Sequence, residues 1–389
     1  MKIVAIHEAS VSISRYADPA LPSGGLTTSI VCLVTDVVRD GERVMGYGFA
    51  SMGRFAQSGL IRERFAPRLL AAAESALATP DRTNLDPFKA WAAMMAGEKP
   101  GGHGERCVAV GTLDMAVWDA AAKIAGLPLN RFLARTLGET PAGRIPVYAG
   151  GGYYYPSDDR ARLADEVRRM VDGGFIAVKI KIGGMELSED LRRIEAAQAA
   201  LPAGGRLAVD AMNAYDPTAG FAAAKALSGR GLWWFEDVCD PLDFETQADI
   251  AHAYDGAIAA GEALFSLAEA RLLDRHGGLR NNRDILLFDP VHCYGLPGYL
   301  QILRHMEGRG WARERFWPHG GHLFGLHVAS GLRLGGAEVN RFCFQPFGGL
   351  AAGCEIRDGQ AVPPDMPGIG FETRPALAAM FRALGADAS

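Results

Sequence analysis

Eight short apolar runs, separated by segments with helical periodicity, occupy the sequence from residue 145 to residue 347. The runs are IPVYAG, AVKIKIG, RLAVDA, WWFED, AIAAGE, DILLFDP, RFWPHG and RFCFQPF, at residues 145–150, 177–183, 206–211, 233–237, 257–262, 284–290, 315–320 and 341–347. Strands that alternate with helices form a parallel sheet, because each helical crossover returns the chain to the same edge. Eight such units predict a closed (β/α) barrel.

The N-terminal part follows a different pattern. Apolar and polar side chains alternate in three segments, at residues 2–13, 27–38 and 43–51. Asp40-Gly41, between the second and third segments, is a favoured hairpin turn. From about residue 60 to 125 the apolar residues recur three and four apart, as in VGTLDMAVWDAAAKIAG, which indicates helices. This part is therefore predicted to be an α+β unit.

A chain of 389 residues is long enough for two such units. We expect a capping domain over residues 1–135 and a barrel domain over residues 140–354. The irregular segment 355–389 is expected to return and complete the cap.

Six consecutive barrel strands end in a residue that can bind a metal or move a proton. The residues are Lys181, Asp210, Glu236, Glu262, Asp289 and His319. The intervals between them are 29, 26, 26, 27 and 30 residues, close to the length of one βα unit. Each residue therefore falls at the same place in successive units, the C-terminal end of the barrel, where active sites are built.

Asp210, Glu236 and Glu262 are expected to converge on one point. Three carboxylates held together repel one another unless a cation is present. Oxygen ligands select a hard ion, and Mg²⁺ keeps its remaining positions for water and substrate. A set of solvated strand ends is the alternative, and the common phase argues against it.

Lys179 and Lys181 lie two apart on one strand, so both side chains point to the same face. A packed core would not accept two lysines, which places them at the mouth of the barrel unless they line a solvated strand edge. A lysine beside another cation and a metal has a depressed pKa and can act as a base.

Asp289 and His319 provide a second acid–base pair, because a carboxylate orients an imidazole and stabilises its charged form. In PHGGH, His322 is a rival to His319, which is preferred because it directly follows the apolar run. Four other histidines are expected to have structural rather than catalytic roles: His7, His252, His276 and His327.

The K-x-K pair, the Asp/Glu/Glu spacing and the Asp–His pair resemble the mandelate racemase group of the enolase superfamily. Within that group, EKPGGHGER, AGGYYYP, VKIKIGG and PHGGH are similar to the D-tartrate dehydratases. The resemblance implies an α/β fold, a (β/α)7β modified TIM barrel under an N-terminal α+β cap. It also implies a Mg²⁺-dependent acid-sugar dehydratase that removes the proton beside a carboxylate and eliminates the β-hydroxyl to give a 2-keto acid.

The resemblance also implies roles for individual residues. Lys181 would be the base, Lys179 would steady the substrate carboxylate, and His319, supported by Asp289, would protonate the departing hydroxyl. Asp210, Glu236 and Glu262 would hold Mg²⁺.

Further substrate contacts are expected from four residues: Asn213, Lys99, His103 and His322. Asn213 stands one position beyond the place where the group has an Asn near the metal. Lys99 and His103 come from the cap. The eighth strand, with Gln345 and Pro346, offers no counterpart to the acidic residue that the racemase carries there.

Two other functions remain open, a racemase or epimerase that uses Lys181 and His319 on opposite faces, and a ligand-binding barrel without catalysis. The missing acid on strand eight disfavours the racemase.

The formal net charge of -5 argues against a nucleic-acid surface, and no apolar run is long enough for a membrane span. Six cysteines without a C-x-x-C pair are expected to be reduced thiols in a cytoplasmic protein. We expect a homo-oligomer that binds a small hydroxy-carboxylate.

Overall fold

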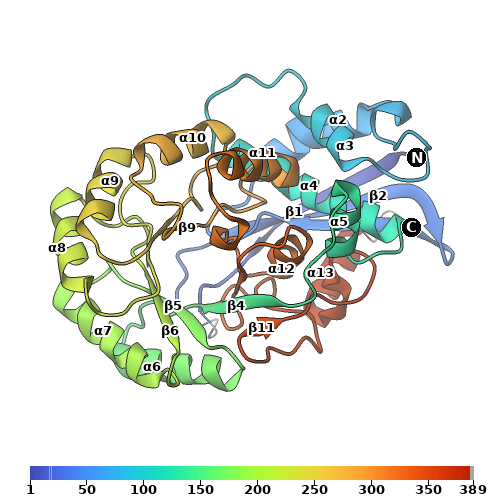
Figure 1. Ribbon diagram of the computed structural model, residues 1–389. Helices are drawn as coiled ribbons and strands as arrows, with labels where there is room; N and C mark the ends of the chain where they lie inside the picture. Colours follow the sequence, from blue (N-terminus) through green and yellow to red (C-terminus); the bar gives the residue numbers. More distant parts are fainter. Residues whose placement is uncertain (17, 19, 386–389) are drawn as a thin grey trace.

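The computed structural model (Figure 1) describes residues 1–16, 18 and 20–385. Seven parallel strands form the curved sheet of the barrel, in the order β10-β4-β5-β6-β7-β8-β9. Their bounds are β4 Ile145–Gly150, β5 Ala177–Lys181, β6 Arg206–Asp210, β7 Phe235–Glu236, β8 Ile258–Ala260, β9 Ile285–Leu286 and β10 Ala337–Val339. The predicted barrel is confirmed.

Helices follow the strands and lie on the outside of the sheet (Figure 1). They are α6 Asp159–Asp172, α7 Leu187–Ala200, α8 Pro217–Leu227, α9 Phe244–Ala253, α10 Leu267–His276, α11 Gly295–Gly308 and α12 Leu323–Gly331. Three of them begin at an aspartate or serine whose side chain accepts from a backbone N–H of the first turn, at Asp216, Asp243 and Ser266. These N-terminal helix caps fix the residue at which each helix begins. The loop between each of these helices and the preceding strand therefore has a defined end, which helps to hold the end of that strand in place.

The run at 315–320, expected as strand seven, completes the sheet with little regular pairing. Phe316 forms a parallel bridge with Leu286, and the N–H of Trp317 donates to the Leu286 carbonyl at 2.9 Å. The N–H of His319 donates to the Leu287 carbonyl at 3.3 Å. This segment therefore lies beside β9, and a short 3-10 turn, Arg313–Arg315, leads into it.

The predicted position of strand eight is wrong. Residues 341–347 form a series of turns in which Cys343, Phe344 and Phe347 are buried. The strand is instead β10, which pairs with β4 from Ala337 to Val339. The hydrophobic pattern predicted a strand at 341–347 because Phe344 and Phe347, which are buried in a turn, resemble the apolar residues of a strand. The actual strand, β10, is only three residues long and has a glutamate at its centre.

The cap is built on an antiparallel sheet of three strands, β1 Ile3–Ser12, β2 Thr27–Arg39 and β3 Glu42–Phe49. The predicted Asp40-Gly41 turn joins β2 to β3, and both residues have positive φ, 52° and 85°. The helical part of the cap comprises α1 Ser58–Leu60, a π-helical turn at Ile61–Phe65, α2 Ala66–Ala71, a 3-10 turn at Glu74–Ala76, α3 Pro87–Met95, α4 Glu105–Ile124 and α5 Leu129–Leu137.

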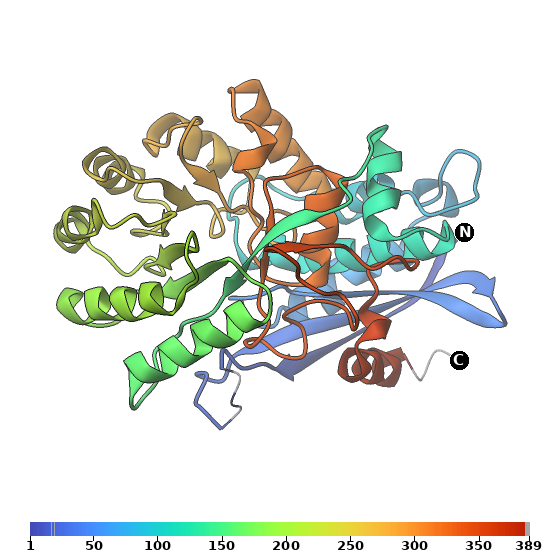
Figure 2. The same cartoon turned by 60° about the horizontal axis from the view of Figure 1, so that its bottom comes forward.

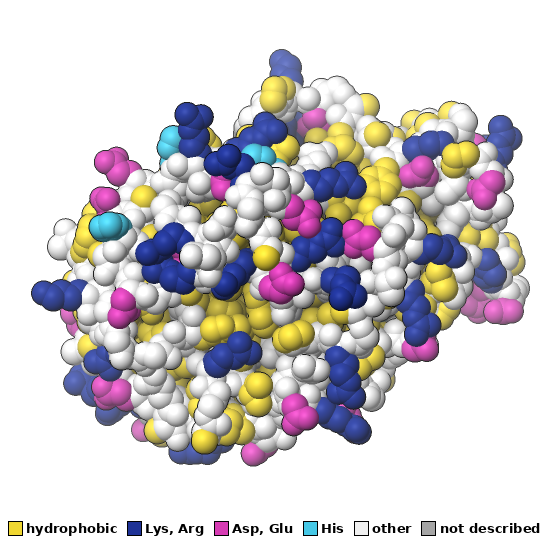
Figure 3. Space-filling view, in the orientation of Figure 1, with side chains coloured by type: hydrophobic (Ala, Val, Ile, Leu, Met, Phe, Trp, Pro, Cys, Tyr) yellow, Lys and Arg dark blue, Asp and Glu magenta, His cyan; other side chains and the backbone are white. Residues whose placement is uncertain are grey.

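The C-terminal segment contains β11 Gln360–Ala361, a 3-10 turn at Phe371–Thr373 and α13 Pro375–Gly385. Figure 2 shows α13 beside the strands of the cap, where Phe381 stacks on Tyr47 with ring centroids 4.6 Å apart. None of the helices in the described part of the chain is long and apolar enough to cross a membrane. Basic and acidic side chains are interspersed over the face shown in Figure 3.

Helix α4 joins the cap to the barrel loop that follows β9. The Leu296 N–H, in the first turn of α11 just beyond that loop, donates to Asp114 of α4 at 2.7 Å. Gly111 lies one turn earlier, where a Cβ atom would stand 1.8 Å from the Val291 carbonyl oxygen. The loop after Asp289 therefore rests directly on the backbone of α4.

Replacing Gly111 with Ala should destabilise the protein, although Ala favours a helix over Gly by about 1 kcal/mol. We expect a loss of about 1–3 kcal/mol in the free energy of unfolding, because the added methyl group must displace the loop. Chemical denaturation measures it. Gly308→Ala is the control, because this helical glycine of α11 has open space around its Cβ position. Equal stability of the two variants would contradict the close packing.

His327 of α12 makes the stability depend on pH. Its Nδ1 accepts from the Asn130 N–H at 3.1 Å, and its Nε2 donates to the Ile369 carbonyl at 3.0 Å. Both contacts are made by the neutral ring, and burial lowers the pKa of His327 to about 4. An unfolded histidine has a pKa of about 6.5, so between these values only the unfolded chain takes up the proton.

The free energy of unfolding should therefore fall as the pH decreases from about 6.5 to about 4, by up to roughly 3 kcal/mol from this residue. His327→Gln should remove that part of the pH dependence, measured by denaturation at a series of pH values. His276→Gln, at an exposed position, should leave it unchanged. An unaltered slope in the His327 variant would show that another group is responsible.

Candidate active site

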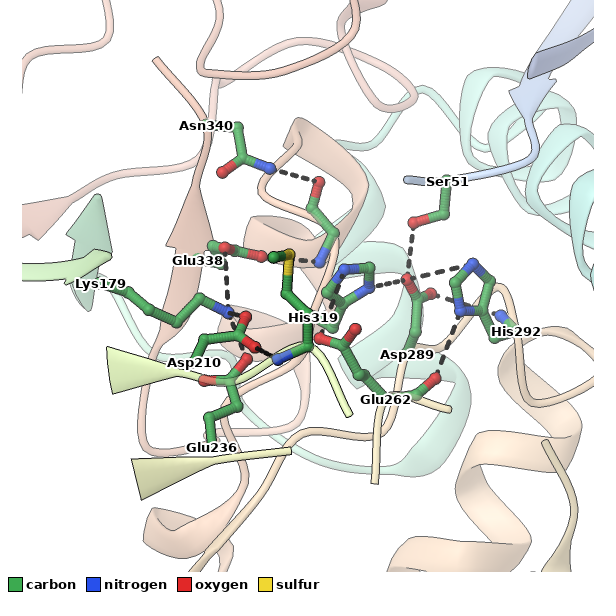
Figure 4. A network of polar contacts seen from close by, with 12 residues as sticks. Ser51, Lys179, Asp210, Glu236, Glu262, Asp289, His292, His319, Glu338 and Asn340 are labelled. Carbon is green, nitrogen blue, oxygen red and sulfur yellow. Dashed lines mark hydrogen bonds and ion pairs between the residues drawn. The ribbon is translucent and has the colours of Figure 1, made fainter. Parts of the chain in front are cut away.

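The barrel interior has an apolar floor with a charged layer above it. Tyr148, Trp234, Leu287 and Trp317 belong to a buried cluster with Ala177 and Ala208. Successive side chains of a strand alternate between its two faces, so a residue two positions further along points into the same interior. Two positions after five of these floor residues, all except Tyr148, come charged or titratable ones: Lys179, Asp210, Glu236, Asp289 and His319. Lys181 follows Lys179 by two more residues, and Figure 4 shows this layer from close by.

The three carboxylates that were predicted to meet do so. One oxygen from each of Asp210, Glu236 and Glu262 lies within 4.8 Å of the others. Burial raises the pKa of Glu236 to about 8. Within the described residues, Glu262 Oε2 is buried without a hydrogen-bond partner. An unsatisfied carboxylate oxygen next to two other carboxylates is suited to a hard divalent cation.

Both lysines of β5 are buried among these carboxylates. Lys179 is 1% exposed, pairs with Glu236 and lies 3.5 Å from Asp210 Oδ2, while Lys181 pairs with Asp210. Burial opposes their charge, yet the neighbouring carboxylates raise the pKa of both lysines above the ordinary value. The expected depression of the Lys181 pKa therefore does not arise from Lys179, because Asp210 outweighs its repulsion. A divalent cation held by Asp210 would counteract that carboxylate charge.

The expectation that strand eight lacks an acidic residue is corrected by Glu338 of β10. Its Oε1 lies 3.5 Å from Lys179 Nζ, and its Oε2 accepts from the Gly320 N–H at 3.0 Å. Burial would raise the pKa of Glu338, but Lys179 and His319 lower it. Gly150 of β4 leaves the space, because a Cβ there would stand 2.2 Å from Glu338 Oε1. Gln345 and Pro346 lie outside the strand.

Asp289 and His319 form the predicted pair. His319 Nδ1 lies 2.9 Å from Asp289 Oδ2, and since a carboxylate accepts, Nδ1 carries the proton. Burial opposes charge on this ring, but Glu262 and Asp289 raise the pKa of His319 to about 9. The hydroxyl of Ser51 donates to the same Asp289 oxygen at 2.6 Å. The cap therefore contributes directly to the pair through Ser51.

His322 lies behind this pair. Its Nδ1 accepts from the Gly325 N–H at 3.2 Å, where it caps α12, and its Nε2 is 3.0 Å from Ser51 Oγ. Both ring nitrogens are thus engaged within the protein, and burial lowers the pKa of His322 to about 4. His322 supports the position of Ser51, and His319 is the histidine that adjoins Glu262.

The other three predicted substrate contacts occupy separate places. Asn213 donates from Nδ2 to the Cys239 carbonyl at 2.8 Å, which links the loops after β6 and β7. Lys99 is exposed on the cap. His103 Nδ1 lies 3.1 Å from the hydroxyl of Tyr294, at the start of α11.

Three residues of the site were missed from the sequence. Glu338 sits in the short segment AEV, where only its apolar neighbours could have indicated a strand. His292 stands three residues after Asp289, with its Nε2 3.8 Å from Asp289 Oδ2. Ser51 gave no signal, because a single serine at the end of a cap strand reveals nothing about what it faces.

Comparison with known proteins assigns the chain to a family. Residues 162–377 match the family model described as enolase C-terminal domain-like. The chain is 27% identical to arabinonate dehydratase of Saccharolobus solfataricus over 70% of this chain and 72% of that protein. It is 28% identical to L-talarate/galactarate dehydratase of Salmonella typhimurium over 72% of this chain and 66% of that protein.

A solved structure agrees. L-Talarate dehydratase from Polaromonas sp. JS666, complexed with Mg and L-glucarate, is 26% identical and superposes with a TM-score of 0.71, covering 94% of each chain. The family model covers more than half of the sequence, and the barrel and the N-terminal antiparallel sheet have the arrangement that the resemblance implied. This chain therefore belongs to the enolase C-terminal domain-like family, in the mandelate racemase group of the enolase superfamily.

Proposed function

We propose that this protein is a Mg²⁺-dependent dehydratase of acid sugars, with a tartrate-like hydroxy-carboxylate as substrate. The observation that carries the proposal is the order of groups around the barrel. The Asp210, Glu236 and Glu262 carboxylates lie between Lys181 on one side and the Asp289–His319 pair on the other. A candidate base, a candidate metal site and a candidate acid thus lie together at the C-terminal end of the barrel.

Mg²⁺ bound by the three carboxylates would stabilise the negative charge that develops on the substrate carboxylate when the α-proton leaves. Lys179, held between Glu236 and Glu338, orients that carboxylate. Lys181 removes the α-proton through its neutral amine. His319 gives its Nε2 proton to the β-hydroxyl, so that the C–O bond breaks and water departs. The resulting enol tautomerises to a 2-keto acid.

The substrate class has two sources of support. The similar proteins act on arabinonate and on talarate or galactarate, as their names state. The phrases EKPGGHGER and AGGYYYP favour tartrate among the acid sugars.

Glu338 makes a racemase or epimerase a second candidate function. The argument against that function was that strand eight lacked an acidic residue, and Glu338 is such a residue. Lys181 and His319 would then exchange protons with opposite faces of one carbon. Formation of a 2-keto acid with release of water supports the dehydratase, and inversion without loss of water supports the racemase. If the protein catalyses neither dehydration nor inversion of any acid sugar in a broad set, it would be a ligand-binding barrel without catalysis.

The metal prediction concerns the three carboxylates. Chelation should abolish activity and Mg²⁺ should restore it. Asp210→Asn or Glu236→Gln should weaken Mg²⁺ binding by at least roughly tenfold, because each removes a charged oxygen ligand. Calorimetric titration with Mg²⁺ measures this without turnover. Glu245→Gln, on the exposed face of α9, is the control. Full activity after exhaustive chelation would refute the proposed metal site.

The proton-transfer prediction separates the base from the acid. Lys181→Ala should abolish both 2-keto acid formation and exchange of the α-hydrogen with deuterated solvent, because both need the base. His319→Asn should abolish 2-keto acid formation but retain exchange, because the acid is needed only when the hydroxyl leaves. Mass spectrometry of recovered substrate gives the exchange. If exchange survived in the Lys181 variant and vanished in the His319 variant, the two roles would be reversed.

A further inference from the structure

A loop of the cap lies over the barrel loop that follows β8. It leaves β3 through Ser51, which has a positive φ of 59° and is held by its hydrogen bond to Asp289. Three residues later the guanidinium carbon of Arg54 stands 4.7 Å from the ring centroid of Phe265. Phe265 itself lies three residues after Glu262, the third carboxylate of the candidate metal site. Arg54 therefore extends from the cap to the edge of that site.

A buried polar atom lies on the same side. The His292 ring is 5.8 Å from Phe265 and 5.6 Å from His319, measured between centroids. His292 is 2% exposed, and its Nε2 has no hydrogen-bond partner among residues 1–16, 18 and 20–385. Figure 4 shows the ring turned toward Asp289, which also faces Ser51 of the cap. The contact of this nitrogen with Asp289 Oδ2, at 3.8 Å, is too long for a hydrogen bond, so Nε2 can still take a hydrogen-bond partner.

The charge of Arg54 is likewise unmatched. Its guanidinium makes no hydrogen bond or ion pair with any residue that the structure describes. Stacking on an aromatic face fixes a guanidinium while its N–H groups remain free at the edge, where they match the two oxygens of a carboxylate. The lysines of β5 pair with Asp210 and Glu236, so the guanidinium of Arg54 is a separate cationic group on the β8 side of the candidate site.

We propose that Arg54 binds the second carboxylate of a dicarboxylic acid sugar, in a subsite that it forms with Phe265 and His292. This inference rests on the proposed dehydratase function and makes it more specific. The carboxylate beside the reacting carbon is held by the β5 lysines and the metal site, and the far end of the substrate reaches the cap. A monocarboxylic acid sugar has only a hydroxyl to offer there, so the protein should prefer diacids.

Matched substrate pairs test the proposal. Tartrate is compared with threonate, and galactarate with galactonate, by the rate of 2-keto acid formation with Mg²⁺ present. The wild type should favour the diacid of the pair that it accepts. Arg54→Met keeps the length of the side chain but not its charge. It should lower kcat/KM for the diacid by about 10- to 100-fold, mainly through KM, since one charge-assisted hydrogen-bonded contact is lost. It should change the rate with the monoacid little.

Arg54→Lys should recover part of the diacid preference, because a charge returns without the planar fork. Arg62→Met is the control, as this cap arginine is 59% exposed in its side chain and pairs with Glu8. If Arg54→Met lowered the rates with diacid and monoacid equally, the residue would only hold the cap on the barrel and the subsite would be refuted. A wild type that accepts monoacids as well as diacids would refute it too, and the dehydratase proposal would stand.

Binding distinguishes the two proposals further. Isothermal titration of each diacid and monoacid, with Mg²⁺ present, is carried out on the wild type and on Arg54→Met. A diacid preference that disappears in the variant supports the subsite, even if no 2-keto acid forms from any substrate and the dehydratase proposal fails. Equal affinity of wild type and variant for the diacid overturns the subsite.

Discussion

The structure has to hold several carboxylates of like charge close together at one end of the barrel. Asp210, Glu236, Glu262 and Glu338 are gathered at the C-terminal end of one barrel, and Lys179 and Lys181 are the buried cations placed among them. Ion pairs of this kind do little for stability when their desolvation is counted. The cluster must therefore be maintained by the scaffold, and the rigid floor of tryptophan, tyrosine and alanine beneath it supplies that support.

The same arrangement makes the protonation of each group depend on its neighbours. Asp210 has a pKa below the ordinary range, since two lysine ion pairs outweigh its burial, whereas burial dominates for Glu236. Lys181 is tied to the charge of Asp210, so a cation on that carboxylate and a neutral amine on the lysine favour each other. The proposed base, the proposed metal site and the proposed substrate anchor are thus one electrostatic unit.

Much of this could be predicted from residue types and spacing. A strand alternates strictly, and a βα unit has a characteristic length, so Lys181, Asp210, Glu236, Glu262, Asp289 and His319 could be aligned before their positions were known. Glu338 could not, because a three-residue strand carries almost no periodic signal and the aromatic turn after it imitates a strand better. Ser51, Arg54 and His292 were out of reach for another reason. Their significance comes from how the cap lies on the barrel, and no local pattern encodes that packing.

The hydrogen bond from Ser51 to Asp289 has a meaning for how such enzymes can be recombined. A cap that only covered a complete active site could be exchanged for the cap of a relative without disturbing the catalytic residues. Here the cap supplies a hydroxyl to the carboxylate that orients His319, and the barrel supplies the anchor that holds the loop in its left-handed turn. A chimera that kept the barrel but took a foreign loop at this point would inherit a loosened histidine along with its new selectivity. In this chain, the proposed diacid selectivity and the proposed proton transfer therefore depend on the same loop.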